Sequence, residues 1–344
     1  MTLANVLAVI MWVGVTAYAL FGGADFGAGF WDLVAGRAEA GAARRTLIEH
    51  SIGPVWEANH VWLIFILVVM WTGFPGLFGA VASTLWIPLT VAALGVIGRG
   101  SAFAFRKSVT ARWQRRAFGA AFAASSVITP FFLGAAAGGV AAGRVPPGVG
   151  QGNAVTSWWN PVSVLTGALA VIVCAYLAAV YLTADARRTG DARLVGQFRA
   201  CALGAGAVAG LIAAVGLAVL HAEAPTLAHG LANRALPLVV VSGVAGLAAL
   251  IVLFLRRFLI ARTAAAVAVG AVVWAWALAE YPYLLAGRLT IAAAAATHSV
   301  LLATSISLLA GAVLLIPSLT WLYVIFQREP RRNVAAPERT PAGG

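Results

Sequence analysis

The sequence predicts an all-α polytopic membrane protein with about nine transmembrane helices. Of its 344 residues, 62% are hydrophobic and 10% are charged, whereas soluble domains carry charge on about a quarter of their residues. The mean hydropathy is +0.92. A bilayer is crossed by about 20 apolar residues, and nine hydrophobic runs meet or approach that length, at about residues 3–34, 54–72, 76–98, 117–140, 160–184, 199–221, 235–255, 261–281 and 294–326.

The two ends of the chain are expected to differ. Residues 2–10 contain no basic segment and no cleavage site follows them, so we expect the first run to be a retained span. Residues 1–328 are expected to form one transmembrane helical domain, and residues 329–344, rich in Pro and Arg, a disordered cytoplasmic tail. Cys174 and Cys201 have no metal-binding spacing, which favours apolar packing.

The basic residues predict the orientation of the chain. Of the 23 Lys and Arg residues, all but Arg144, Arg234 and Arg288 lie near the loops after the odd-numbered spans or in the C-terminal tail. The positive-inside rule therefore places the N-terminus outside and the C-terminus in the cytoplasm. The net charge of +12 indicates topology and contact with anionic membrane lipid. It does not indicate a nucleic-acid partner, because no aromatic-interleaved basic surface accompanies it.

Polar residues are concentrated where the second run begins, at Trp56, Glu57, Asn59 and His60. Polar groups inside a membrane segment are costly, so they are usually retained for a function. Glu57 follows Pro54 in the first helical turn, where the helix dipole favours a carboxylate. His60 lies three residues later and projects from the same helix face.

A second intramembrane carboxylate, Asp25, lies in the glycine-rich residues 22–29. Gly23 and Gly27 form a small-xxx-small face that lets another helix approach closely. Asp25 precedes Arg37 by twelve residues and Glu57 follows Arg45 by twelve, so both carboxylates lie roughly 18 Å from the same loop. We therefore expect Asp25 and Glu57 to meet across the first helical hairpin.

Three interpretations of Asp25, Glu57 and His60 remain open. They can relay protons through water, or they can cap one another and hold the hairpin together. The spacing Glu57-x-x-His60 also occurs in di-iron bundles, but those sites need two such motifs and the chain has one. A haem ligand among His60, His221 and His298 is possible in principle, but nothing specific in the sequence supports it.

Two further charged residues each have two interpretations. Arg99, at the inner end of the third run, is either a topology anchor or the counter-charge of Asp25 or Glu57. Glu280, at the outer boundary of the eighth run, is either an interfacial residue in an aromatic belt or part of a transport pathway. The belt interpretation is favoured for Glu280, because Tyr281 and Tyr283 flank Pro282 directly after it.

Three motifs occur in a specific order and spacing: Gly-Ala-Asp-Phe-Gly-Ala-Gly at 23–29, the whole of 51–64 from Ser-Ile-Gly-Pro-Val-Trp-Glu to Val-Trp-Leu-Ile, and Arg-Gly-Ser-Ala-Phe-Ala-Phe-Arg at 99–106. With these motifs the chain resembles subunit II of the cytochrome bd-type quinol oxidases, over essentially its full length. Glu-Tyr-Pro-Tyr at 280–283 and the long last run also fit.

The resemblance implies a fold of two four-helix bundles plus one peripheral helix in a bacterial cell membrane. It implies a haem-free subunit paired with a subunit I that carries haems b and d and oxidises quinol while reducing dioxygen to water. It also allows for a structural quinone and a small single-span accessory subunit. No metal or other cofactor is expected on this chain.

The resemblance further implies that Asp25 and Glu57 are the candidates for delivery of cytoplasmic protons. From the residues themselves we add His60 as a candidate, with Trp56, Asn59 and Arg99 in support. Some family members carry glutamine in place of His60, which weakens any obligatory role for that residue. Two other functions share these sequence features. One is a proton-coupled membrane transporter, although the sequence shows no clear internal repeat. The other is a purely structural subunit that only stabilises its partner.

Overall fold

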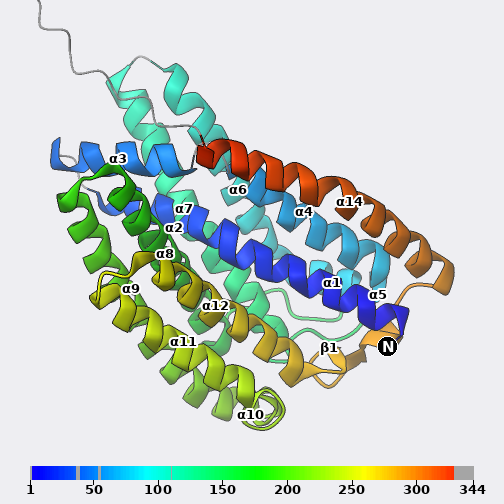
Figure 1. Cartoon of the computed structure of the whole chain (residues 1–344). Coiled ribbons are helices and arrows are strands. Elements are labelled where there is room, and N and C mark those ends of the chain that lie inside the picture. Colours follow the sequence, from blue (N-terminus) through cyan, green and yellow to red (C-terminus); the bar gives the residue numbers. More distant parts are fainter. Residues whose placement is uncertain (1, 36–38, 53–55, 110, 329–344) are drawn as a thin grey trace, which may run out of the picture. The chain divides into compact units, whose positions relative to one another are not determined.

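The computed structural model describes residues 2–35, 39–52, 56–109 and 111–328, and most of this length is helical (Figure 1). Among the described residues, eight helices are long and apolar enough to cross a membrane, or nine if one bent pair counts as a span. The predicted all-α polytopic class is therefore confirmed. Residues 1–301 and 302–344 are separate units and are described separately. The tail expected at 329–344 lies outside the described residues and stays a prediction.

The first span contains an unpredicted change of helix type. It consists of α1 (Leu3–Ala17), the π-helical turn η1 (Tyr18–Gly22) and α2 (Gly23–Val34). A π-turn holds more residues than an α-turn and rotates the helix faces that follow it. α1 accordingly packs against α4 (Trp56–Gly73), whereas α2 packs against α7 (Arg112–Ala141) and α8 (Pro161–Thr189).

The boundaries expected for the third run, 76–98, are wrong. The chain instead forms α5 (Pro75–Thr84), bent by 118° from the end of α4, and then α6 (Trp86–Ser108). Pro75 occupies the first turn of α5, and Pro88 lies in the first turn of α6. Because proline lacks the N–H of a continuing helix and clashes with the preceding turn, Pro88 favours a helix that begins near residue 86.

The loop expected between the first two spans contains a polar helix, α3 (Glu39–Ile52). Four later helices form a closed bundle: α8, α9 (Ala192–Glu223), α11 (Leu236–Phe254) and α12 (Phe258–Glu280). Each packs on the next, and α12 returns to α8. The buried residues shared by this bundle are mostly small or aliphatic, among them Leu177, Val180, Ala202, Leu253 and Ala265.

The earlier spans form a second group, in which α6 packs on α7, α7 on α2, and α1 on α4. The short helix α10 (Pro225–Ala232) joins α9 to α11. After α12 come a two-stranded antiparallel ribbon, β1 (Tyr283–Leu285) with β2 (Leu289–Thr290), and α13 (Ile291–Ala294). α14 (His298–Arg328) is a long apolar helix with Pro317 inside it.

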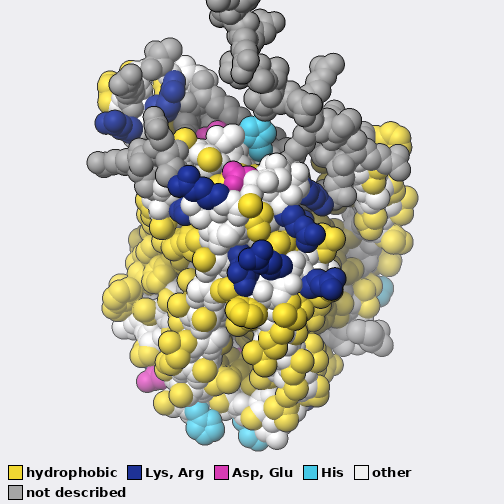
Figure 2. Space-filling view, turned by 60° about the vertical axis from the view of Figure 1, so that its left-hand side comes forward, with side chains coloured by type: hydrophobic (Ala, Val, Ile, Leu, Met, Phe, Trp, Pro, Cys, Tyr) yellow, Lys and Arg dark blue, Asp and Glu magenta, His cyan; other side chains and the backbone are white. Residues whose placement is uncertain are grey.

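Charged and apolar side chains are segregated on the surface. Figure 2 shows basic side chains gathered over the upper part of one face, with hydrophobic side chains over most of the remainder. One basic residue, Arg199, donates hydrogen bonds to the carbonyls of Leu253 (2.9 Å) and Phe254 (2.9 Å) and so caps the end of α11. Cationic side chains are favourable at helix C-termini, where carbonyl groups lack partners.

Gly27 lets α2 approach the backbone of α8. A Cβ atom at residue 27 would collide with the carbonyl group of Cys174 and lie 2.7 Å from the amide nitrogen of Ala175. The indole nitrogen of Trp31 donates to the carbonyl of Ala175 at 2.7 Å and links the same two helices. Gly23 is less constrained, because its nearest neighbour would be Cys174 Sγ at 3.5 Å. Of the two predicted packing glycines, Gly27 therefore makes the closer approach.

We expect Gly27→Ala to destabilise the protein and Gly23→Ala to be nearly neutral. The methyl group at residue 27 meets backbone that cannot rotate away, so the loss should be about 1–3 kcal/mol or more. The midpoint of thermal unfolding of the purified protein measures both variants. Equal midpoints would contradict the close approach of α2 and α8.

Candidate functional site

Asp25 and Arg99 form a buried ion pair between α2 and α6. Arg99 Nη1 donates to Asp25 Oδ2 at 2.6 Å, and Nη2 donates to Oδ1 at 2.8 Å. Nη2 also donates to the backbone carbonyl of Asp25 at 3.0 Å. The two residues are 3% and 1% exposed. This two-pronged geometry is the strongest form of carboxylate recognition by arginine.

The guanidinium of Arg99 is enclosed on its other sides by α2 and α7. Its Nε donates to Ser126 Oγ at 3.0 Å, and that hydroxyl donates to the carbonyl of Phe122 at 2.7 Å. The guanidinium carbon lies 5.0 Å from the ring centre of Phe26 and 4.8 Å from that of Phe122. Such cation–π contacts add attraction where water is excluded.

His60 and Tyr18 also pack against the ring of Phe26. The His60 ring centre is 5.8 Å from that of Phe26 and 6.4 Å from that of Tyr18. Phe26 therefore contacts both the guanidinium of Arg99 and the imidazole of His60. The hydroxyl of Tyr18 is buried and has no hydrogen-bond partner within the described part of the chain. A buried polar group of this kind is usually satisfied by an ordered water.

The predicted contact between Asp25 and Glu57 stays a prediction. The backbone of Trp56 and Glu57 begins α4, but their side chains lie outside the described residues. Asn59, on the same helix, is 5% exposed. Arg99 was expected either to anchor the topology or to balance a carboxylate, and in the structure it pairs with Asp25.

Asp32 is a second buried carboxylate on α2, which the sequence analysis did not single out. It lies two turns beyond Asp25 on α2, is 7% exposed, and forms an ion pair with Arg45 Nε of α3 at 3.3 Å. The i, i+7 spacing places Asp25 and Asp32 on one helix face. This spacing is the sequence signal from which Asp32 could have been predicted to be buried. The pair lies at the end of α2 that leads into the basic loop.

The remaining histidines and cysteines do not gather around this site. His50, His221, His229 and His298 are exposed, and both cysteines are free. Over residues 2–35, 39–52, 56–109 and 111–328, no cluster of three or more His, Cys, Asp or Glu side chains could hold a metal ion. Glu280 lines a different pocket, at the end of α12.

We expect the effects of Asp25→Asn and Arg99→Gln on stability to be coupled. Each single change leaves the other charge buried without its partner, which costs about 3–5 kcal/mol. The double variant removes both charges and should lose clearly less than the sum of the single losses. Thermal unfolding of the purified protein measures the stability of all three variants. A loss of stability in the double variant equal to the sum of the two single losses would contradict the ion pair.

Comparison with known proteins relates this chain to one family. The family model for cytochrome bd terminal oxidase subunit II matches residues 3–326. The chain is similar to a chain in the structure of the bd oxidase from Geobacillus thermodenitrificans, with a TM-score of 0.78 and 26% identity. That match covers 96% of this chain and 100% of the other.

Two curated relatives match over shorter stretches. A cytochrome bd ubiquinol oxidase subunit 2 of Bacillus subtilis is 35% identical over 38% of this chain and 36% of its own length. A cytochrome bd-I ubiquinol oxidase subunit 2 of Escherichia coli is 26% identical over 55% of this chain and 51% of its own length. The aligned stretches thus span about half or less of these relatives. From the family match and the structural similarity together, we conclude that the chain belongs to the cytochrome bd terminal oxidase subunit II family.

Proposed function

We propose that this chain is the haem-free subunit II of a bd-type terminal quinol oxidase in a bacterial cell membrane. It would pair with a haem-bearing subunit I that oxidises quinol and reduces dioxygen to water. The observation that carries this proposal is the similarity of almost the whole chain to a chain of a bd oxidase structure. The names of the curated relatives, which are subunits of quinol oxidases, support it.

We further propose that Asp25, Glu57 and His60 admit protons from the cytoplasm. Dioxygen reduction consumes protons, and water enters a hydrocarbon-lined bundle only where polar groups stabilise it. The ion pair at Asp32 and the pair at Asp25 lie two turns apart on α2, and the ring of Tyr18, whose hydroxyl is buried, packs against the ring of His60. These groups supply polar positions along one path.

The geometry of the ion pair suggests how Asp25 would act in this path. Both of its carboxylate oxygens already accept hydrogen bonds from Arg99. Protonation of either oxygen would neutralise the carboxylate and remove the charge attraction that holds the pair closed. We therefore propose that opening of the Asp25–Arg99 pair is a controlled step of proton entry.

We expect Asp25→Asn to lower quinol-driven oxygen uptake by about tenfold or more, because the amide cannot take up a proton. Because this variant is also less stable, the rate is expressed per haem in the complex that remains folded, for which the KM for quinol and the haem spectrum should stay unchanged. Asp25→Glu should restore part of the rate. Asp185→Asn, which changes a carboxylate near the surface, is the matched control.

Glu57→Gln is expected to lower oxygen uptake in the same way. Unchanged uptake at neutral pH in both Asp25→Asn and Glu57→Gln would contradict the proton path. A loss of haem together with activity in Asp25→Asn would instead favour a purely structural subunit.

The proposed orientation places the N-terminus outside and the C-terminus in the cytoplasm. The segregation of basic side chains supports it (Figure 2). We expect an impermeant thiol reagent added to intact cells to label Gln151→Cys but not Thr189→Cys, in a background in which Cys201 is serine. Both residues are exposed. In inverted vesicles the pattern should reverse, and the opposite result would overturn the orientation.

A proton-coupled transporter is favoured by one observation, the 118° break between α4 and α5, because broken helices line many transport sites. Purification of the tagged chain in mild detergent separates the two functions. Haem absorbance and quinol-driven oxygen uptake that co-purify with a second large membrane subunit support the oxidase. A colourless chain that purifies alone would support the transporter.

A further inference from the structure

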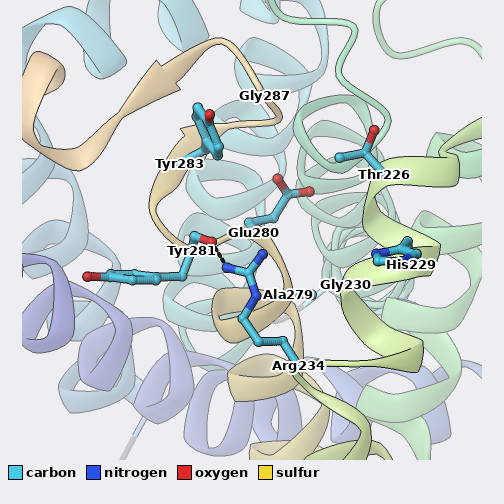
Figure 3. A pocket seen from close by; sticks show the side chains of 9 residues that line it. All are labelled: Thr226, His229, Gly230, Arg234, Ala279, Glu280, Tyr281, Tyr283 and Gly287. Atoms are coloured by element: carbon cyan, nitrogen blue, oxygen red, sulfur yellow. Dashed lines mark hydrogen bonds between the residues drawn. The ribbon is translucent and has the colours of Figure 1, made fainter.

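A second polar site lies at the end of α12, in a pocket of about 310 Å³ (Figure 3). This volume is at the lower end of the range for small-molecule sites, roughly 300–1,000 Å³. The pocket is built by α10, by the connection from α10 to α11, by the end of α12 and by the β1–β2 ribbon. Its polar lining consists of Thr226, His229, Arg234, Glu280, Tyr281 and Tyr283.

The helices that line the pocket, α10 and α12, pack closely against each other. A Cβ atom at Gly230 would lie 2.5 Å from the carbonyl oxygen of Ala279, so only glycine lets α10 lie directly against the last turn of α12. Beneath this contact is a cluster of buried apolar residues, namely Ala224, Leu227, Ala235, Ala275 and Ala279. The polar side chains are therefore held on elements that pack closely against one another.

Glu280 gives the pocket a site for a cation. It is the last residue of α12, where the helix dipole is negative and adds to the carboxylate charge. Its Oε1 atom is buried and has no hydrogen-bond partner within the described residues. Leaving such a group unsatisfied costs free energy, and a donor with positive charge would recover it.

An anionic group has its own partners in the same pocket. Arg234 donates one hydrogen bond to the carbonyl of Tyr281, and its guanidinium carries further N–H donors. Figure 3 shows the Glu280 carboxylate pointing into the space between Tyr283, Thr226 and His229, with the Arg234 guanidinium on the same pocket wall as Tyr281. The pocket thus presents an acceptor and separate donors to a single ligand.

The position of the pocket points to a lipid. α11 and α12 are both candidate membrane spans, and the pocket lies where α11 begins and α12 ends. The apolar side chains of Leu236 and Leu278, close in sequence to Arg234 and Glu280, are 46% and 37% exposed. A ligand here can therefore place its polar end in the pocket and its apolar chains along the spans.

We propose that this pocket binds the phosphoethanolamine headgroup of a membrane phospholipid. The ammonium group binds the Glu280 carboxylate, and the phosphate binds Arg234 and His229. This inference does not depend on the proposed oxidase function, because it rests only on residues of the pocket.

Native mass spectrometry of the purified, delipidated complex tests the proposal. The probes are phosphatidylethanolamine, its N-acetylated form, which lacks the ammonium charge, and soluble glycerophosphoethanolamine. We expect Glu280→Gln to weaken phosphatidylethanolamine binding by about tenfold or more, as loss of a charge-assisted hydrogen bond does. Glu223→Gln, which changes an exposed carboxylate outside the pocket lining, should leave binding unchanged.

The wild-type complex alone also decides the question, so the test does not require that Glu280→Gln folds. We expect the N-acetylated lipid to bind about tenfold more weakly than phosphatidylethanolamine. Equal binding of these two lipids, or unchanged binding in Glu280→Gln, would overturn the proposal. Glycerophosphoethanolamine binding as tightly as the lipid would overturn the membrane source of the headgroup.

Discussion

The ion pair between Asp25 and Arg99 is the interaction on which this region of the structure depends. Two full charges are buried at 3% and 1% exposure between helices that are far apart in sequence. Neither can be left alone without a large desolvation cost, so α2 and α6 must stay in this register. Ser126 and the rings of Phe26 and Phe122 complete the enclosure. The local backbone is adapted to this arrangement: η1 turns the helix just before Asp25, and Gly27 brings α2 onto α8.

The cost of leaving a buried charge without a partner also distinguishes the polar site on α2 from the pocket at Glu280. At Asp25 and at Asp32 the chain supplies its own counter-charge, from Arg99 and Arg45. At Glu280 it supplies no ion pair within the described residues, and one carboxylate oxygen stays buried without a partner. A charge satisfied inside the protein fixes helices, and in our proposal the Asp25 charge also takes part in proton entry. A charge left unsatisfied at a span end is instead available to a molecule from outside.

Much of the fold could be predicted because hydrophobic runs and their flanking arginines reflect the bilayer directly. Local chemistry accounts for the errors. Pro75 and Pro88 divide the run at 76–98, and nothing in residues 18–22 distinguishes a π-turn from an α-turn. Asp25 was identified as an intramembrane carboxylate, but its partner could not be chosen from sequence. Pairing over 74 residues depends on how α2, α6 and α7 pack, which periodicity does not specify. Glu57 stays a sequence-based expectation, since its side chain lies outside the described residues.

The central claim is that proton entry requires the Asp25 carboxylate and the opening of its pair with Arg99. Time-resolved electrometry on the reconstituted complex tests it most directly, because under the proposed function the reaction of the fully reduced enzyme with dioxygen would move protons across part of the membrane. In Asp25→Asn, we predict that the electrogenic phase of proton uptake slows by about tenfold or more. The electron-transfer steps that precede proton uptake, followed by haem absorbance, should keep their wild-type rates. An electrogenic phase with wild-type rate and amplitude in this variant would contradict the account.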